Sequence, residues 1–168
     1  KKGKSIRFPE KDVRPMGRAA AGVRGIRIAP GDEVVTVANV SLPDLSNLLV
    51  VMENGLSKTT KVTEYRFQGR GGSGVKAANI TAKTGNIVGG FVLTGSEKGD
   101  LVCMSKRGQT IRLALTDIPE RSRATQGVIV MRLDAGDTVA SISLILEETG
   151  EHAEADVKKA LEKAKREE

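Results

Sequence analysis

Gln68–Val75 reads Gln-Gly-Arg-Gly-Gly-Ser-Gly-Val, and parts of this stretch recur along the chain at a nearly fixed spacing. Its final Gly-Val pair occurs three times, at steps of 52 and 53 residues, at 22–23, 74–75 and 127–128. An arginine stands four residues before the glycine of each pair, at Arg18, Arg70 and Arg123. A further glycine keeps the same spacing, at Gly3, Gly55 and Gly108. A period near 50 residues predicts a repeat architecture.

Each repeat predicts short strands arranged as two hairpins that are joined by a basic loop. In the second repeat, residues 48–52 and 57–62 flank the turn residues Asn54-Gly55, and residues 75–82 and 87–93 flank a second turn at Gly85. The third repeat predicts the same pattern with strands at 101–104, 109–113, 128–133 and 138–146. The first repeat retains the predicted segments 4–8, 22–28 and 33–40.

Four short strands in a repeat of about 50 residues are typical of a propeller blade. We therefore predict an all-β fold of β-pinwheel or β-propeller-like blades, each with four antiparallel strands. The predicted segments are a first blade at 1–45, truncated at its N-terminal strand, a second at 46–98, a third at 99–146, and a charged acidic tail at 147–168. Because propellers have four to eight blades, three blades predict a fragment of a larger ring.

The tail breaks the repeat pattern. Val157, Ala160, Leu161 and Ala164 recur at helical spacing among charged neighbours, which predicts a short amphipathic helix. The tail is interpreted either as a solvated, partly helical end or as an acidic arm that competes with DNA for the basic surface.

Positive charge is concentrated at the start of the chain. The net charge is +6 with a pI near 9.6, and residues 1–30 carry nine Lys or Arg against two acidic residues. Residues 146–168 instead carry five basic against eight acidic residues. A basic body predicts a polyanionic partner, and the alternative is a generally basic soluble protein.

Residues suited to catalysis are scarce. Cys103 is the single cysteine, which excludes a disulfide within the chain, and its apolar neighbours predict a buried strand position. His152 is the single histidine and Tyr65 the single tyrosine, so a hydrolytic triad or a metal site has no support. Tyr65 is interpreted as a packing residue. The sequence contains no run of about 18 apolar residues, so no membrane span is predicted. The expected location is the cytoplasm.

The glycine-rich stretch does not match a nucleotide-binding motif. It lacks the Lys-Ser/Thr ending of a P-loop, and a strand rather than a helix follows it. The recurring arginines favour another partner, because a row of guanidinium groups suits the phosphates of duplex DNA. Sequence-independent contacts of this kind suit DNA bending more than base reading. The predicted DNA-binding residues are Arg14, Arg18, Arg24, Arg66, Gln68, Arg70, Lys76, Arg121 and Arg123.

Several motifs in the same order resemble the C-terminal domain of the bacterial DNA gyrase A protein. They include Gly3–Phe8, Asp12–Arg18, Gly22–Arg27, Gly31–Val35, Asn54-Gly55, Thr63–Tyr65 and Thr125–Ile129. The resemblance covers residues 1–146 and implies the last three blades of a six-bladed pinwheel that wraps DNA around a basic rim. It also implies a degenerate copy of the family's Gln-Arg-Arg-Gly-Gly-Lys/Arg-Gly box, in which Gly69 and Ser73 replace basic residues, at Gln68, Gly69, Arg70, Gly71, Gly72, Ser73 and Gly74.

The resemblance implies a non-catalytic, DNA-wrapping part of a type II topoisomerase. This part would support ATP-dependent negative supercoiling by an A2B2 enzyme whose cleavage tyrosine lies in the N-terminal portion of the same polypeptide. No cofactor is expected in this chain, and ATP and Mg²⁺ are expected on the partner gyrase B protein. The expected partners are double-stranded DNA, that N-terminal portion and gyrase B, and no membrane.

Two alternative functions remain open at this stage. One is the homologous C-terminal domain of topoisomerase IV, which guides substrate choice and decatenation. The other is a β-propeller scaffold that binds acidic proteins.

Overall fold

A computed structural model describes residues 1–95 and 97–147 of the chain, and the predicted tail lies beyond them apart from its first residue. Nine strands make up the described part, namely β1 (Lys4–Ser5), β2 (Ser46–Met52), β3 (Leu56–Lys61), β4 (Val75–Lys76), β5 (Ile87–Thr94), β6 (Gly99–Ser105), β7 (Thr110–Ala114), β8 (Val128–Ile129) and β9 (Val139–Leu146). Single 3-10 turns occur at η1 (Glu10–Asp12), η2 (Pro43–Leu45), η3 (Val62–Glu64) and η4 (Leu115–Asp117). Within this part no helix has the length and apolar character needed to cross a membrane.

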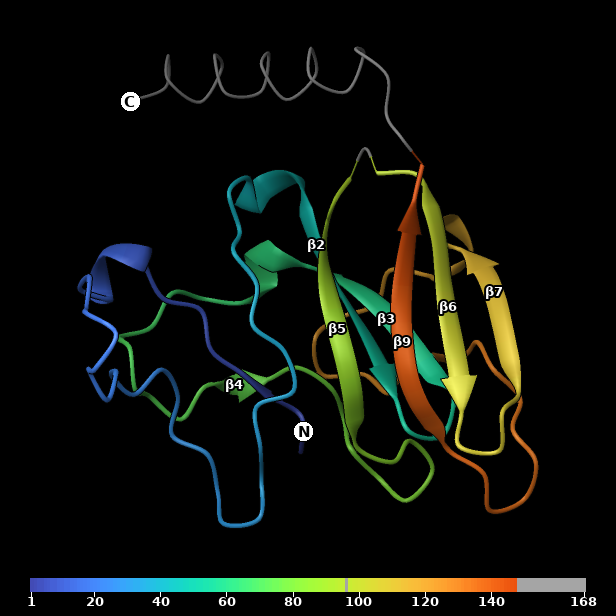
Figure 1. Cartoon of the computed structure of the whole chain (residues 1–168). Helices are drawn as coiled ribbons and strands as arrows, with labels where there is room; N and C mark the ends of the chain where they lie inside the picture. The colour runs from blue at the N-terminus through green and yellow to red at the C-terminus, as the bar shows by residue number, and fades with distance from the viewer. Residues whose placement is uncertain (96, 148–168) are drawn as a thin grey trace.

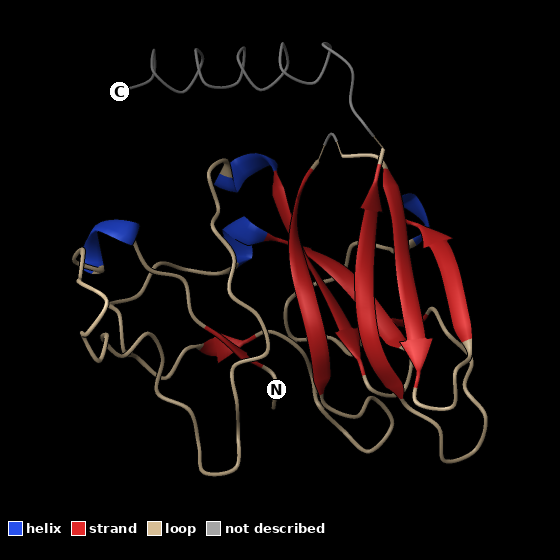
Figure 2. Ribbon diagram, in the orientation of Figure 1, coloured by secondary structure: helices blue, strands red, loops and turns tan. Residues whose placement is uncertain are grey.

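The strands form three antiparallel sheets, in the orders β1-β4, β5-β2-β3-β8 and β7-β6-β9. The second and third sheets stand side by side with β5 next to β9, and the first repeat is mostly loop (Figures 1 and 2). The predicted all-β class is therefore confirmed. The 3-10 turns η1, η3 and η4 also follow the repeat, at steps of 52 and 53 residues.

The first hairpin of each complete repeat is confirmed, but the predicted second hairpin is wrong. β2 pairs with β3 and β6 pairs with β7, as expected. β4 does not pair with β5, and β8 does not pair with β9. Instead β4 pairs with β1, and β8 pairs with β3, so each short strand joins the sheet of the preceding repeat. The segments predicted at 22–28 and 33–40 form no strand.

Glycine makes this strand exchange possible. Gly74 and Gly127 precede β4 and β8 with φ of +70° and +82°, a conformation in which side chains other than glycine are strained. At either position a Cβ atom would lie 2.5 Å from a carbonyl oxygen of the neighbouring repeat, on Ser5 or Ser57. The Gly-Val pair that defines the period is thus the point where one repeat enters the sheet of another. Consequently, the second sheet extends beyond the predicted limits 46–98 to include β8, whereas the third sheet lies within 99–146.

Both faces of β2 are buried, which explains its uninterrupted apolar run. Leu49 and Val51 belong to a core cluster shared with the third sheet, where they meet Leu101, Cys103 and Met131. Val50 and Met52 face the first repeat in a second cluster, with Ala78, Ile87 and Val35. Alternate side chains of a strand point to opposite faces, so this central strand buries all four residues from Leu49 to Met52. Cys103 is fully buried as predicted, and burial raises the pKa of its thiol to about 11.

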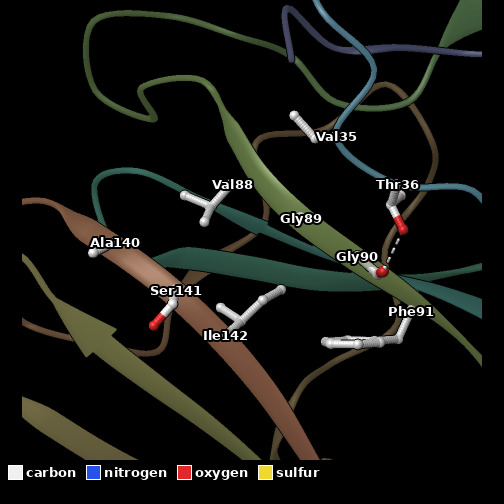
Figure 3. A pocket seen from close by; sticks show the side chains of 9 residues that line it. All are labelled: Val35, Thr36, Val88, Gly89, Gly90, Phe91, Ala140, Ser141 and Ile142. Carbon is white, nitrogen blue, oxygen red and sulfur yellow. Dashed lines mark hydrogen bonds between the residues drawn. The ribbon is translucent and has the colours of Figure 1, made fainter.

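The inner segments of the three repeats meet around an open cavity of about 250 Å³ (Figure 3). Its lining comes from equivalent places in each repeat, at 35–36, 88–91 and 140–142. The Thr36 hydroxyl donates a hydrogen bond to the Gly90 carbonyl across it, at 3.0 Å. The lining holds apolar side chains, threonine, serine and glycine but no charged group, so this cavity is not where a polyanion would bind.

Candidate nucleic-acid interface

The basic loops of the three repeats lie next to one another in chain order. We call residues 9–21, 63–74 and 116–127 the first, second and third basic loops. Backbone hydrogen bonds join the first repeat to the second loop, from Arg27 N to Gly72 O at 2.8 Å and from Gly71 N to Gly25 O at 2.7 Å. An equivalent bond joins the second repeat to the third loop, from Asn79 N to Thr125 O at 3.1 Å. Neighbouring loops also contact each other directly, since Arg70 Nε donates to the Asp12 carbonyl and Arg123 N donates to Glu64 Oε2, each at 2.9 Å. The three loops therefore form a continuous row.

Most of the predicted DNA-binding cations are exposed on or beside this row. We call the exposed set the basic rim, which comprises Arg14, Arg18, Arg24, Arg66, Lys76 and Arg121. Exposed guanidinium and ammonium groups on adjacent loops are free to contact a chain of phosphates without a large desolvation cost.

Arg70 and Arg123, both predicted to bind DNA, make contacts within the chain that sequence reasoning missed. Arg70 Nη1 donates to the carbonyl of Arg24 at 2.8 Å, and its Nε donates to the carbonyl of Asp12 at 2.9 Å. Arg123 Nη1 donates to the carbonyl of Lys76, also at 2.8 Å. Arg24 and Lys76 occupy equivalent positions, so each arginine fastens its loop to the preceding repeat. Both are half-buried and retain further N–H donors that these bonds do not use.

The box-like segment 68–74 is built into the same contacts. The Gln68 backbone N–H donates to the Arg7 carbonyl at 2.9 Å, and Gly71 takes a φ of +80° as its backbone N–H donates to the first repeat. Gly69 and Ser73 are exposed, and these are the two positions where the resemblance places basic residues. In this copy the segment therefore holds the loops together and contributes one guanidinium.

Lys58 is a buried residue beneath the third basic loop that sequence reasoning overlooked. Its side chain is fully buried, and its Nζ donates to the carbonyls of Ser122 at 2.9 Å and Arg123 at 2.7 Å, within the third basic loop. Ile6 and Ile111 occupy the equivalent positions of the other repeats, so a lysine replaces an isoleucine here. Desolvation lowers the pKa of the Lys58 ammonium to about 8. The signal that could have identified Lys58 is a lysine at a position where the other two repeats have isoleucine.

Lys58 predicts a specific pH dependence of stability. Its pKa is about 8 in the folded chain and 10.5 when unperturbed, so unfolding above pH 8 requires proton uptake. The free energy of unfolding should therefore rise with pH between 8 and 9.5. Lys58→Ile should remove this contribution, whereas Lys61→Ile, at an exposed neighbouring position, should retain it. Urea unfolding at a series of pH values measures the difference, and parallel curves for the wild type and Lys58→Ile would contradict the assignment.

Tyr65 is buried, and burial raises its pKa to about 12. This is the opposite of what an activated nucleophile needs, and it agrees with the predicted packing role.

Phe67, two residues on, is 60% exposed, and the Arg7 guanidinium lies 4.0 Å from the centre of its ring. In residues 1–95 and 97–147 no cluster of three or more His, Cys, Asp or Glu could hold a metal ion.

The sequence matches the family model described as DNA gyrase C-terminal domain, beta-propeller, over residues 1–41, 46–94 and 99–145. This chain belongs to that family. The matched intervals correspond to the three repeats, and they leave out the segments just before β2 and β6.

Curated relatives from Staphylococcus aureus support the same assignment. The DNA gyrase A protein of strain MRSA252 is 42% identical over 149 residues, which is 89% of this chain and 17% of the relative. The same protein of strain NCTC 8325 / PS 47 is 41% identical over 151 residues, which is 90% of this chain and 17% of the relative. The chain therefore spans about a sixth of the length of these relatives.

Two solved structures resemble the fold. A DNA gyrase A C-terminal domain has a TM-score of 0.75 and 29% identity, covering 86% of this chain and 48% of that one. A C-terminal domain of DNA topoisomerase IV has a TM-score of 0.77 at 24% identity, and the match covers 86% of this chain and 44% of that one. The second likeness shows the fold alone. Because the curated relatives are gyrase A proteins at above 40% identity, gyrase is the better supported of the two topoisomerase interpretations.

Proposed function

We propose that this chain binds double-stranded DNA along the basic rim and wraps it, as a non-catalytic part of a gyrase A protein. The observation that carries the proposal is the continuous row of three loops, fastened by Arg70 and Arg123, that presents exposed cations from each repeat. Membership of the gyrase C-terminal domain family supports it.

The chemistry of the rim favours phosphate contacts over base reading. Arginine donates charge-assisted hydrogen bonds that match phosphate geometry, and a row of them releases condensed counterions from a duplex. Tyr65 is buried and Phe67 is the one strongly exposed aromatic side chain in the described ranges. One ring cannot stack successive bases, which is how proteins that prefer single strands hold them.

In the parent enzyme, wrapping would present DNA to the cleavage site in the N-terminal portion of the same polypeptide. Supercoiling would then use ATP and Mg²⁺ bound by gyrase B in an A2B2 assembly, in the cytoplasm. This chain would position the DNA for the reaction, and it would need no cofactor to do so. A topoisomerase IV domain remains the second candidate, because its fold is equally similar.

The proposal predicts salt-sensitive binding that favours duplex DNA. Neutralising about six phosphates gives a slope of roughly −5 for log affinity against log salt concentration. Fluorescence anisotropy with a duplex and with one of its strands, over a series of salt concentrations, measures both quantities. Equal affinity for the two ligands, or a slope near zero, would argue for the scaffold interpretation instead.

A further inference from the structure

Phe67 carries an exposed aromatic ring in the middle of the row of basic loops. Its side chain is 60% exposed, and it follows the rim residue Arg66 in the second basic loop. The second repeat has a described neighbour on each side, since backbone hydrogen bonds join Gln68 to the first repeat and Asn79 to the third. In a repeat architecture each repeat contacts only its neighbours. A further repeat of the same polypeptide would therefore not cover this ring.

The ring is held in place by Arg7 of the first repeat. The Arg7 guanidinium lies over the ring, 4.0 Å from its centre. The Nη1 atom of Arg7 donates to the carbonyls of Val62 and Tyr65, at 3.2 and 3.3 Å. The backbone at Arg7 and Phe67 also forms a parallel bridge. One face of the ring is therefore covered by a fixed guanidinium, and the ring needs little further ordering when a ligand contacts it.

This pair of residues is particular to the second loop. The third repeat forms the equivalent backbone bridge between Thr59 and Glu120, so a hydroxyl replaces the guanidinium and a carboxylate replaces the ring. The Glu120 carboxylate lies 3.7 Å from the Lys61 ammonium, in an exposed ion pair. In the first loop the equivalent residue is Pro15. At this position, only the second of the three loops adds an aromatic ring to its exposed arginine.

An exposed ring beside an arginine that contacts phosphate fits the sugars of the DNA backbone. Each deoxyribose links two phosphates, and it lacks the 2′-hydroxyl of ribose, so this side of the sugar is apolar. Insertion between two base pairs would need both faces of the ring, and Arg7 covers one of them. The free side of the ring can instead lie against a sugar while Arg66 contacts a neighbouring phosphate.

We infer that Phe67 packs against the deoxyribose sugars of the bound duplex and makes the second basic loop selective for DNA over RNA. This inference rests on the proposed binding of duplex DNA along the basic rim. In RNA the 2′-hydroxyl would meet the ring, where it would lose contact with water and gain no hydrogen-bond partner. Phosphate contacts do not make this distinction, because DNA and RNA carry the same phosphate group.

Fluorescence anisotropy with DNA and RNA duplexes of the same sequence tests the inference. Phe67→Ser should lower the affinity for duplex DNA about tenfold, the size expected for burying most of an exposed ring, and it should leave the affinity for duplex RNA unchanged. Phe67→Leu should keep most of the preference for DNA because it retains an apolar surface. Met104→Ser removes an exposed apolar side chain outside the basic loops, and it should change neither affinity. Because every variant meets the same two duplexes, the difference between B-form and A-form geometry cancels.

The salt dependence of binding separates this inference from the proposed function. Phe67→Ser should leave the slope of log affinity against log salt concentration unchanged, because it removes no ionic contact. Arg66→Ala should instead reduce the slope by about one. If the wild type binds duplex DNA with the expected slope, but Phe67→Ser weakens DNA and RNA binding equally or weakens neither, the inference is wrong and the proposed function stands. If the wild type does not bind duplex DNA, both are wrong.

Discussion

Gly55→Ala is expected to unfold the chain or nearly so, whereas Gly108→Ala leaves it folded. The two glycines occupy equivalent turns with φ of +77° and +87°, so both substitutions share the cost of a left-handed conformation, about 1–2 kcal/mol. Only at Gly55 does the new methyl group overlap the Met131 carbonyl. The Gly55 carbonyl also accepts the amides of Val130 and Met131, at 2.9 and 3.1 Å, and these bonds lock β8 onto β3.

Accommodating that methyl group requires the backbone of the third repeat to move away from the second. We expect a further loss of about 3 kcal/mol or more in the free energy of unfolding, which is a large share of the stability of a small protein. Urea unfolding at concentrations where the chain is monomeric measures both variants. If the two substitutions cost the same, the strand exchange does not hold the repeats together.

The second large effect concerns the rim. Replacing Arg14, Arg66 and Arg121 together by alanine should weaken duplex binding about 100-fold, at about 1 kcal/mol for each lost phosphate contact. The salt slope should fall by about three because each contact contributes close to one. Replacing Lys83, Lys106 and Arg107, which are exposed on turns outside the basic loops, removes the same charge.

Affinity for duplexes of unrelated sequence distinguishes the two sets. If position on the rim governs binding, the triple variant at Lys83, Lys106 and Arg107 should change affinity only slightly. The triple variant of the rim arginines should weaken binding to all duplexes about equally. If both sets weaken binding equally, net charge governs it. Arg70 and Arg123 are unsuitable for this test, because their loss would also release the second and third loops from the preceding repeats.

The sequence predicted the parts of the fold that depend on local pattern. The period follows from glycines that need positive φ, and the β2–β3 and β6–β7 hairpins follow from apolar runs around glycine turns. The second hairpins were predicted wrongly because β4 and β8 pair across repeats. Nothing in the local sequence at 75–82 distinguishes a return within the blade from pairing with the neighbouring sheet.

The site was predicted at the level of residue type and loop position. Arg18, Arg70 and Arg123 share one position, but their spacing did not reveal that two of them donate to backbone carbonyls of the preceding repeat. Lys58 was missed because lysine is almost never buried without a partner, and its partners are carbonyls about 64 residues further along the chain. Aligning the three repeats shows it as a lysine among isoleucines, and this is the one local sign.

Wrapping, as distinct from binding, is the central claim, and the linking number of a closed circle tests it most directly. Nicked circular DNA is ligated in the presence of increasing amounts of the chain, the protein is removed, and the topoisomers are separated on a gel. Wrapping around the rim predicts a shift in linking number of one sign that grows with the amount bound and disappears with the Arg14, Arg66 and Arg121 triple variant. Saturating duplex binding with no shift would contradict the account.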